Sequence, residues 1–205
     1  MLSPTWRQIA LSAHVTSSVG WFGSVAAFLA LAVIGLRGNG TEDVIRSAYV
    51  AMETIGWFVI VPFSIASLAT GLIQSLGTQW GLIRHYWVLA KLLITVGASV
   101  LLLVHMQVVN TVAGAASSGT LSVDHLRDPR MQLVADAGAA SVVLLIAIVL
   151  SVFKPQGRTV LGLADGGSEV VAVRTPMFYA FWLMVGALIV AIVVRHLSGG
   201  IPSHH

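Results

Sequence analysis

The chain has 205 residues, of which 57% are apolar and only 9% are charged. A typical soluble domain has about a quarter of its residues charged. Here 11 lysines and arginines and 8 aspartates and glutamates are too few to solvate a soluble globule of this size. This composition argues against a soluble enzyme, a disordered chain and a nucleic-acid-binding protein. The absence of cysteine excludes disulfides, thiolate metal sites and thiol catalysis.

Long apolar stretches divide the sequence into predicted membrane-spanning helices. A bilayer core about 30 Å thick requires about 20 apolar residues in a helix. The sequence predicts five such helices, at about 8–36, 48–76, 85–110, 131–153 and 175–197. None of these stretches has the alternating pattern of a membrane β-barrel. We therefore expect an all-α integral membrane bundle that forms a single domain over residues 1–205.

The linker at 154–174 is polar and contains two short runs with high β propensity around Asp165-Gly166-Gly167-Ser168. Two such runs around a Gly-containing turn are typical of a β-hairpin. The sequence therefore predicts a small extramembrane hairpin in this linker.

Basic and imidazole side chains gather near one predicted membrane face. At a rise of about 1.5 Å per residue, His14 and Lys91 both fall about 10 Å below that face, and Arg84 lies in the same layer. An imidazole can ligate haem iron, while Arg and Lys can neutralise its propionates. Trp21 shares the His14 face and could stack on a macrocycle. These four residues therefore form a candidate haem or porphyrin site.

Simpler roles remain open for the same residues. Arg84 could mark the membrane boundary, and Lys91 could extend its amine to the nearer interface. His14 could serve only as a hydrogen-bonding residue between helices. A charge within a span is costly, however, and this cost favours a functional role for Lys91.

Carboxylates and imidazoles gather near the opposite membrane face. Each lies within about two turns of that boundary and comes from a different predicted helix. The set is Glu53, His105, Asp136 and His196. These side chains suit a divalent metal ion or a proton relay. The alternative is that they are interfacial residues paired with Arg46, Arg130 or Arg195.

Small residues recur every four positions in the first predicted helix, at Ser12, Thr16, Gly20 and Ser24. Such stripes allow close packing of helices within a bilayer. We therefore expect the bilayer itself as one partner, and a second copy or another membrane protein as a further partner on small-residue faces.

Several short motifs carry a family resemblance. Ala13-His14-Val15 is followed by Gly20-Trp21-Phe22-Gly23 at the start of the first span, and Thr70-Gly71-Leu72 ends the second. The run from Trp87 to Leu93 opens the third, which ends near His105. Over about residues 8–110, this pattern resembles the superfamily of copper-resistance D membrane proteins and J-type protoporphyrinogen oxidases. Residues 77–106 also resemble uncharacterised actinobacterial multi-pass proteins.

The resemblance implies specific roles for two residues. The oxidase branch binds haem b and oxidises a porphyrinogen, so His14 would be a haem b ligand and Lys91 would contact the cofactor or substrate. The copper branch implies a copper ion as an alternative cofactor. The oxidases typically have four helices, whereas the sequence here predicts a fifth. The resemblance also implies a bacterial plasma membrane protein.

Charge gives a weak indication of membrane orientation. Positive charges in short loops favour the cytoplasmic side. The Lys and Arg residues at linkers and helix ends are divided evenly between the two predicted faces. Lys91 lies nearer the face of the N-terminus and adds one positive charge there, which favours a cytoplasmic N-terminus.

Three functions therefore remain open from the sequence. The first is a haem- or porphyrin-binding redox protein with His14 as ligand. The second is a transporter or sensor of metal ions or protons, and the third is a non-catalytic membrane subunit. A hydrolase is disfavoured because no GxSxG elbow is present, and nucleotide chemistry is disfavoured because no phosphate-binding glycine motif is present.

Overall fold

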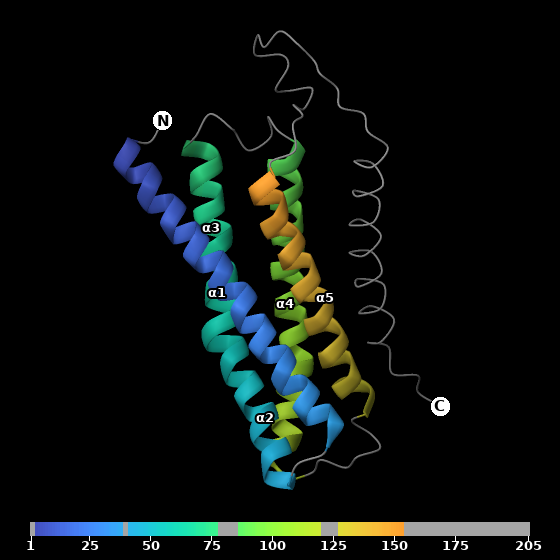
Figure 1. Cartoon of the computed structure of the whole chain (residues 1–205). Helices are drawn as coiled ribbons and strands as arrows, with labels where there is room; N and C mark the ends of the chain where they lie inside the picture. The colour runs from blue at the N-terminus through green and yellow to red at the C-terminus, as the bar shows by residue number, and fades with distance from the viewer. Residues whose placement is uncertain (1–2, 39–40, 78–85, 120–126, 154–205) are drawn as a thin grey trace, which may run out of the picture.

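The computed structural model describes residues 3–38, 41–77, 86–119 and 127–153 (Figure 1). Every regular element in these ranges is helical. In chain order they are α1 (Pro4–Arg37), α2 (Glu42–Ile55), η1 (Gly56–Ile60), α3 (Val61–Gly77), α4 (Tyr86–Ser117) and α5 (Arg127–Phe153). The elements α2, η1 and α3 follow one another without a break, and η1 is a π-helical turn. The predicted all-α fold is confirmed for the described part of the chain.

Four helices in the described ranges are long and apolar enough to cross a bilayer. They are Pro4–Arg37, Glu42–Gly77, Val88–Ser117 and Asp128–Val152. Their lengths and compositions are compatible with a multi-pass membrane protein. The predicted fifth helix, 175–197, and the predicted hairpin, 154–174, lie outside the described residues.

The helices continue past the apolar stretches from which they were predicted. The second helix begins at Glu42 rather than near 48, and the third continues to Ser117 rather than ending near 110. The fourth begins at Arg127 rather than near 131. Hydropathy marks only the apolar part of a helix, whereas polar turns outside a bilayer core can remain helical. The linkers before α2 and before α5 are therefore shorter than predicted.

The start of α1 has a clear local cause. Ser3 is the N-cap, and its hydroxyl accepts a hydrogen bond of 3.5 Å from the backbone N–H of Trp6. Pro4 occupies the first helical position, where its missing N–H costs nothing and its fixed φ suits a helix. The helix ends at Gly38, whose φ of 62° is favourable for glycine.

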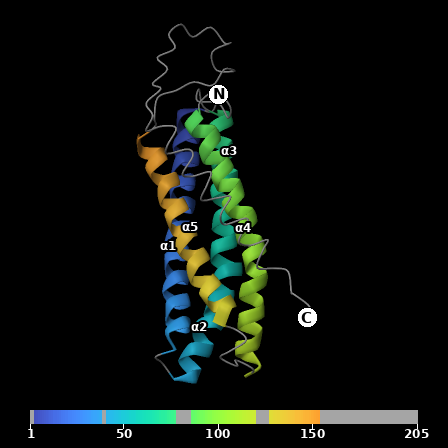
Figure 2. The ribbon, with the colours of Figure 1, turned by 90° about the vertical axis from the view of Figure 1, so that its right-hand side faces the viewer.

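The four long helices run alternately up and down, as Figures 1 and 2 show together. Around the bundle, α1 and α4 each pack against α2, α3 and α5. The helices α1 and α4 therefore lie on a diagonal across the interior. The start of α1, the end of α3, the start of α4 and the end of α5 share one end of the bundle (Figure 1).

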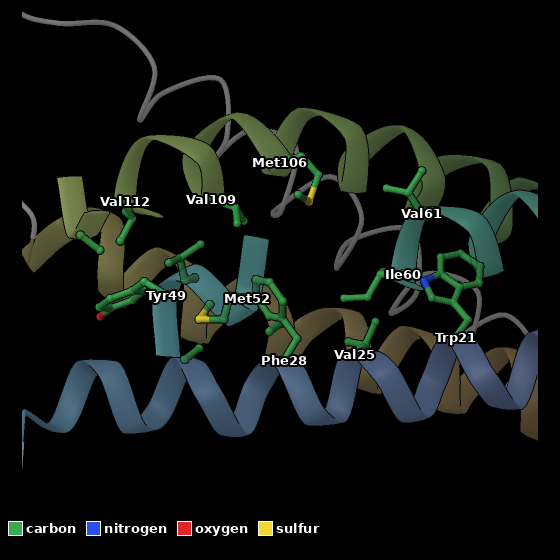
Figure 3. Packing of buried hydrophobic residues seen from close by; sticks show 14 of the residues in the cluster. Trp21, Val25, Phe28, Tyr49, Met52, Ile60, Val61, Met106, Val109 and Val112 are labelled. Carbon is green, nitrogen blue, oxygen red and sulfur yellow. The ribbon is translucent and has the colours of Figure 1, made fainter. Parts of the chain in front are cut away.

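The main core lies between α1, α2, α4 and α5 and is filled by large apolar side chains (Figure 3). Tyr49 and Met52 from α2 are almost completely buried against it. Gly35 of α1 makes room for the Tyr49 ring, since a Cβ there would lie 2.6 Å from Tyr49 Cζ. This close approach fixes the distance between α1 and α2.

The π-helical turn precedes Pro62, which cannot donate a hydrogen bond to the preceding turn. A π-turn is one way in which a helix accommodates such a break. Gly56 opens this turn, and a Cβ there would lie 2.6 Å from Met106 Cε. The turn therefore also allows α4 to approach closely.

Large apolar side chains cover much of the outer surface. Phe58 and Leu76 of the continuous helix Glu42–Gly77 are 78% and 74% exposed, and Val152 of α5 is 71% exposed. Such exposure is unfavourable in water but compatible with contact to lipid. The outer surface therefore agrees with the predicted lipid partner.

Candidate functional site

A cleft of about 820 Å³ opens between α1, α3, α4 and α5 at the end of the bundle where α1 begins. Figure 1 shows α1 and α3 diverging from α4 and α5 towards this end. The described residues that line the cleft are mostly apolar or small. Its charged lining residues in the described ranges are Arg7 and Lys91, and none of the described lining residues is a carboxylate. The cleft therefore combines an apolar wall with positive charge.

One flank of the cleft is open to the outside of the bundle. Leu11, Val15 and Val19 of α1 line it and are each more than half exposed. These exposed apolar side chains lie on a helix that is compatible with lipid contact. A ligand could therefore enter from the hydrocarbon region between α1 and the opposite wall.

His14 lies on the cleft wall, and contacts with α3 fix its orientation. Its Nδ1 lies 3.1 Å from the carbonyl oxygen of Ser67 and 3.1 Å from the hydroxyl of Thr70. A carbonyl oxygen only accepts hydrogen bonds, so Nδ1 carries the hydrogen and the Nε2 of a neutral ring carries the lone pair. Gly71 leaves room for the ring, since a Cβ there would lie 3.2 Å from His14 Cε1.

Lys91 turns its amine into the bundle rather than out to the interface. Its Nζ lies 3.1 Å from His14 Nε2 and donates a hydrogen bond of 2.6 Å to the hydroxyl of Ser151. Ser151 in turn donates to the carbonyl of Ala147 at 2.8 Å. Side chains from α1, α4 and α5 therefore converge on one amine.

The meeting of His14 and Lys91 agrees with their predicted depths. The two residues do not come from adjacent helices, however, because α1 and α4 lie on a diagonal of the bundle. The long lysine side chain reaches across the interior to close this distance. The predicted alternative for His14, hydrogen bonding between helices, is what its contacts show, and its role as a haem ligand stays a prediction.

Of the other two residues of the predicted haem site, the structure describes only Trp21. Trp21 is buried and lines the cleft. Figure 3 shows its ring directed into the bundle from α1. Arg84 lies outside the described residues.

Sequence inspection missed several polar residues of this site. Ser67, Thr70 and Ser151 orient His14 and Lys91. Serine and threonine occur on many helix faces, and Thr70 stood out only as part of the motif Thr70-Gly71-Leu72, with no site role assigned to it. Arg7 could have been found, because Arg7 and His14 are separated by seven residues and so share a helix face. It lines the same cleft, about 10 Å along the axis from His14.

A second polar pair lies deeper in the bundle. His105 Nδ1 of α4 lies 3.1 Å from Asp136 Oδ2 of α5. The Phe28 ring meets the imidazole edge-on, with 6.1 Å between the ring centroids. The pair borders a small, largely apolar cavity of about 90 Å³. Trp21 and Leu144 line both this cavity and the larger cleft.

The predicted metal layer is present only in part. His105 and Asp136 meet, but no three histidine, aspartate or glutamate side chains in the described ranges come together as a metal site. Glu53 therefore does not complete the pair. His196 lies outside the described residues. A pair of potential ligands is fewer than the three or four protein ligands of typical zinc sites.

No family model, no curated protein and no solved structure matches this chain.

Proposed function

We propose that this protein binds an amphiphilic, carboxylate-bearing ligand of the porphyrin class within the membrane, with haem b as its specific ligand and His14 as the iron ligand. The observation that carries this proposal is the His14–Lys91 pair on the wall of the large cleft. The resemblance of residues 8–110 to the oxidase superfamily points to the same ligand class.

The charge and shape of the cleft support an acidic, apolar ligand. A volume of about 820 Å³ lies within the range of small-molecule sites, about 300–1,000 Å³. Arg7 and Lys91 would pair with carboxylates, and Trp21 would lie beside the apolar body. The described wall carries no negative charge that would repel such a ligand.

The surroundings of His14 fit an iron ligand, provided that Lys91 moves away from its Nε2. Histidine ligands of metals commonly hold their second ring nitrogen in a hydrogen bond to a carbonyl, and the Ser67 carbonyl occupies that position. The other nitrogen, Nε2, contacts Lys91. Ligation therefore requires Lys91 to move away, and a carboxylate of the ligand is the group that would draw its amine to a new position. A bound haem would supply one-electron chemistry.

Hemin titration of the detergent-purified protein tests the proposal. We expect a saturable shift of the Soret band at one hemin per chain. His14→Ala should weaken binding by more than about 10–100-fold, because losing only a group that hydrogen-bonds a metal ligand already costs that much. His105→Gln is the matched control, because it removes a histidine from another layer, and it should bind hemin as the parent protein does.

A second ligand separates carboxylate recognition from iron ligation. Hemin dimethyl ester retains the iron and the macrocycle but lacks free carboxylates, so we expect it to bind about tenfold more weakly through loss of one or two ion pairs. A spectrum that is unchanged by hemin, or that changes equally in the parent and His14→Ala proteins, would contradict the proposal.

A further inference from the structure

The Lys91 amine has the surroundings of a nucleophile. A general base, the Nε2 of His14, lies 3.1 Å from Nζ. The base is itself oriented by a third group, since its Nδ1 hydrogen points to the Ser67 carbonyl. An activated nucleophile is recognised by this order of nucleophile, base and orienting group. Ser151 accepts a further hydrogen from Nζ and holds the amine in place.

Apolar side chains make up much of the remaining cleft wall. Leu92, Leu144 and Ile148 line the same cleft, and Thr95 adds a hydroxyl one turn along α4. Lysines placed in apolar surroundings beside a base are the ones that form imines with carbonyl compounds. Neither Arg7 nor Ser151 could form such a bond. The described part of the cleft therefore offers one primary amine to a bound carbonyl group.

We propose that Lys91 forms a reversible imine with an apolar aldehyde or ketone that enters the cleft from the bilayer. This activity goes beyond the proposed haem binding and does not depend on it. It uses the same histidine in a different role, as a base rather than as a metal ligand.

The reaction balances with the groups in the cleft. His14 Nε2 takes a proton from the Lys91 ammonium, and the resulting amine adds to the carbonyl carbon. The nitrogen then passes a proton to the new alkoxide oxygen, which gives a carbinolamine. The imidazolium protonates the carbinolamine hydroxyl, which leaves as water while the nitrogen lone pair forms the C=N bond. One carbonyl compound and one lysine ammonium give one protonated imine and one water. No oxidant, reductant or metal ion is required.

The chain provides an internal control for the test. It contains two lysines, Lys91 and Lys154, so Lys154 reports the background reactivity of a lysine in the same molecule. The haem-free, detergent-purified protein is incubated with dodecanal, and imines are reduced with sodium borohydride. Peptide mass spectrometry then gives the rate of alkylation at each lysine.

We expect Lys91 to be alkylated at least about a hundredfold faster than Lys154, which is the lower range of general base catalysis. The comparison is made within one chain and needs no variant to fold. Glyceraldehyde, a polar aldehyde, should show no preference for Lys91. Equal rates at the two lysines with dodecanal would overturn the proposal. A preference for Lys91 that is as strong with glyceraldehyde would overturn the assignment of an apolar substrate.

Variants then test the role of each partner. His14→Gln keeps a hydrogen-bond acceptor but cannot take the proton. The ratio of the alkylation rate at Lys91 to that at Lys154 should therefore fall towards one. His105→Gln should leave it unchanged. Both proteins are checked for parental helix content and elution volume. A folded His14→Gln protein that labels Lys91 as fast as the parent would contradict the role of His14 as base. Failure of hemin binding would leave these results unaffected.

Discussion

At the scale of single residues, the position of one hydrogen decides what His14 can do. The Ser67 carbonyl takes the hydrogen of Nδ1 and leaves the Nε2 lone pair facing Lys91. The same lone pair would serve as an iron ligand or as a base. The two proposed activities are therefore mutually exclusive at any moment, and the position of the Lys91 amine selects between them.

His105 and Asp136 lead to a prediction on stability. Removing one member of a buried pair leaves the other poorly solvated, whereas removing both can be nearly neutral. We expect His105→Leu and Asp136→Leu each to destabilise the bundle. The double variant should lose about 1–2 kcal/mol less free energy of unfolding than the two single variants lose together. This coupling is near the upper end of those measured in membranes.

The measurement is unfolding of the purified protein by increasing SDS in mixed micelles, followed by circular dichroism. Leu150→Ala with Asp136→Leu forms a control cycle, because the two side chains lie about four turns apart on α5 and should act additively. Additive effects in the His105–Asp136 cycle would show that the 3.1 Å contact contributes no coupling.

The residue scale also shows what the sequence could and could not reveal. Charges are costly in a bilayer, so Lys91 and Asp136 stood out in apolar surroundings, and counting helical rise placed Lys91 level with His14. The diagonal contact, the orienting groups on α3 and the separation of Glu53 from the pair depend on how helices rotate about their axes. Apolar residues cover most faces of these helices, so the sequence pattern leaves that rotation undefined.

At the scale of elements, the contact between α1 and α2 depends on a glycine. A Cβ at Gly35 would lie 2.6 Å from the rigid ring of Tyr49, which is 1% exposed. Gly35→Ala should therefore force the helices apart and cost about 1–3 kcal/mol, as overpacking does in other cores. SDS-dependent unfolding measures this loss.

Gly23 provides the matched substitution on the same helix. No atom lies within 4 Å of a Cβ placed there. Gly23→Ala should therefore be neutral or stabilise the helix by up to about 1 kcal/mol, since alanine favours helix over glycine. Equal effects of the two substitutions would contradict the close packing of α1 on α2.

The element boundaries show where hydropathy stops being informative. The sequence located the four spanning helices by their apolar stretches, but it missed the turns between Glu42 and Ala48 and between Asn110 and Ser117. Charged residues interrupt the first of these segments, and small residues lower the hydropathy of the second, although Val112 and Ala116 are buried in the core. Pro62 predicts an irregularity in the second helix, but composition does not show that it takes the form of a π-helical turn before the proline.

At the scale of the whole molecule, alternating helices place defined residues at opposite ends. Ser3 precedes α1, whereas Thr41 precedes α2 and Ser118 follows α4 at the other end. The chain has no cysteine, so single cysteines can be introduced without background. We expect Thr41→Cys and Ser118→Cys to react with an impermeant maleimide from one side of the membrane, and Ser3→Cys from the other.

Labelling of intact and permeabilised cells makes this comparison. The result also gives the orientation, which the even distribution of Lys and Arg leaves weakly defined. Labelling of Ser3→Cys and Thr41→Cys from the same side would contradict a membrane-spanning α1.

The open flank of the cleft has a consequence for how its occupancy is set. Leu11, Val15 and Val19 line the cleft and are each more than half exposed, so in a bilayer the proposed ligand would dissolve in the leaflet before it met Lys91. The quantity that governs binding is then the mole fraction of ligand in the leaflet, not its concentration in water. Diluting the protein with extra lipid at a fixed total amount of ligand should therefore lower the occupancy of the site.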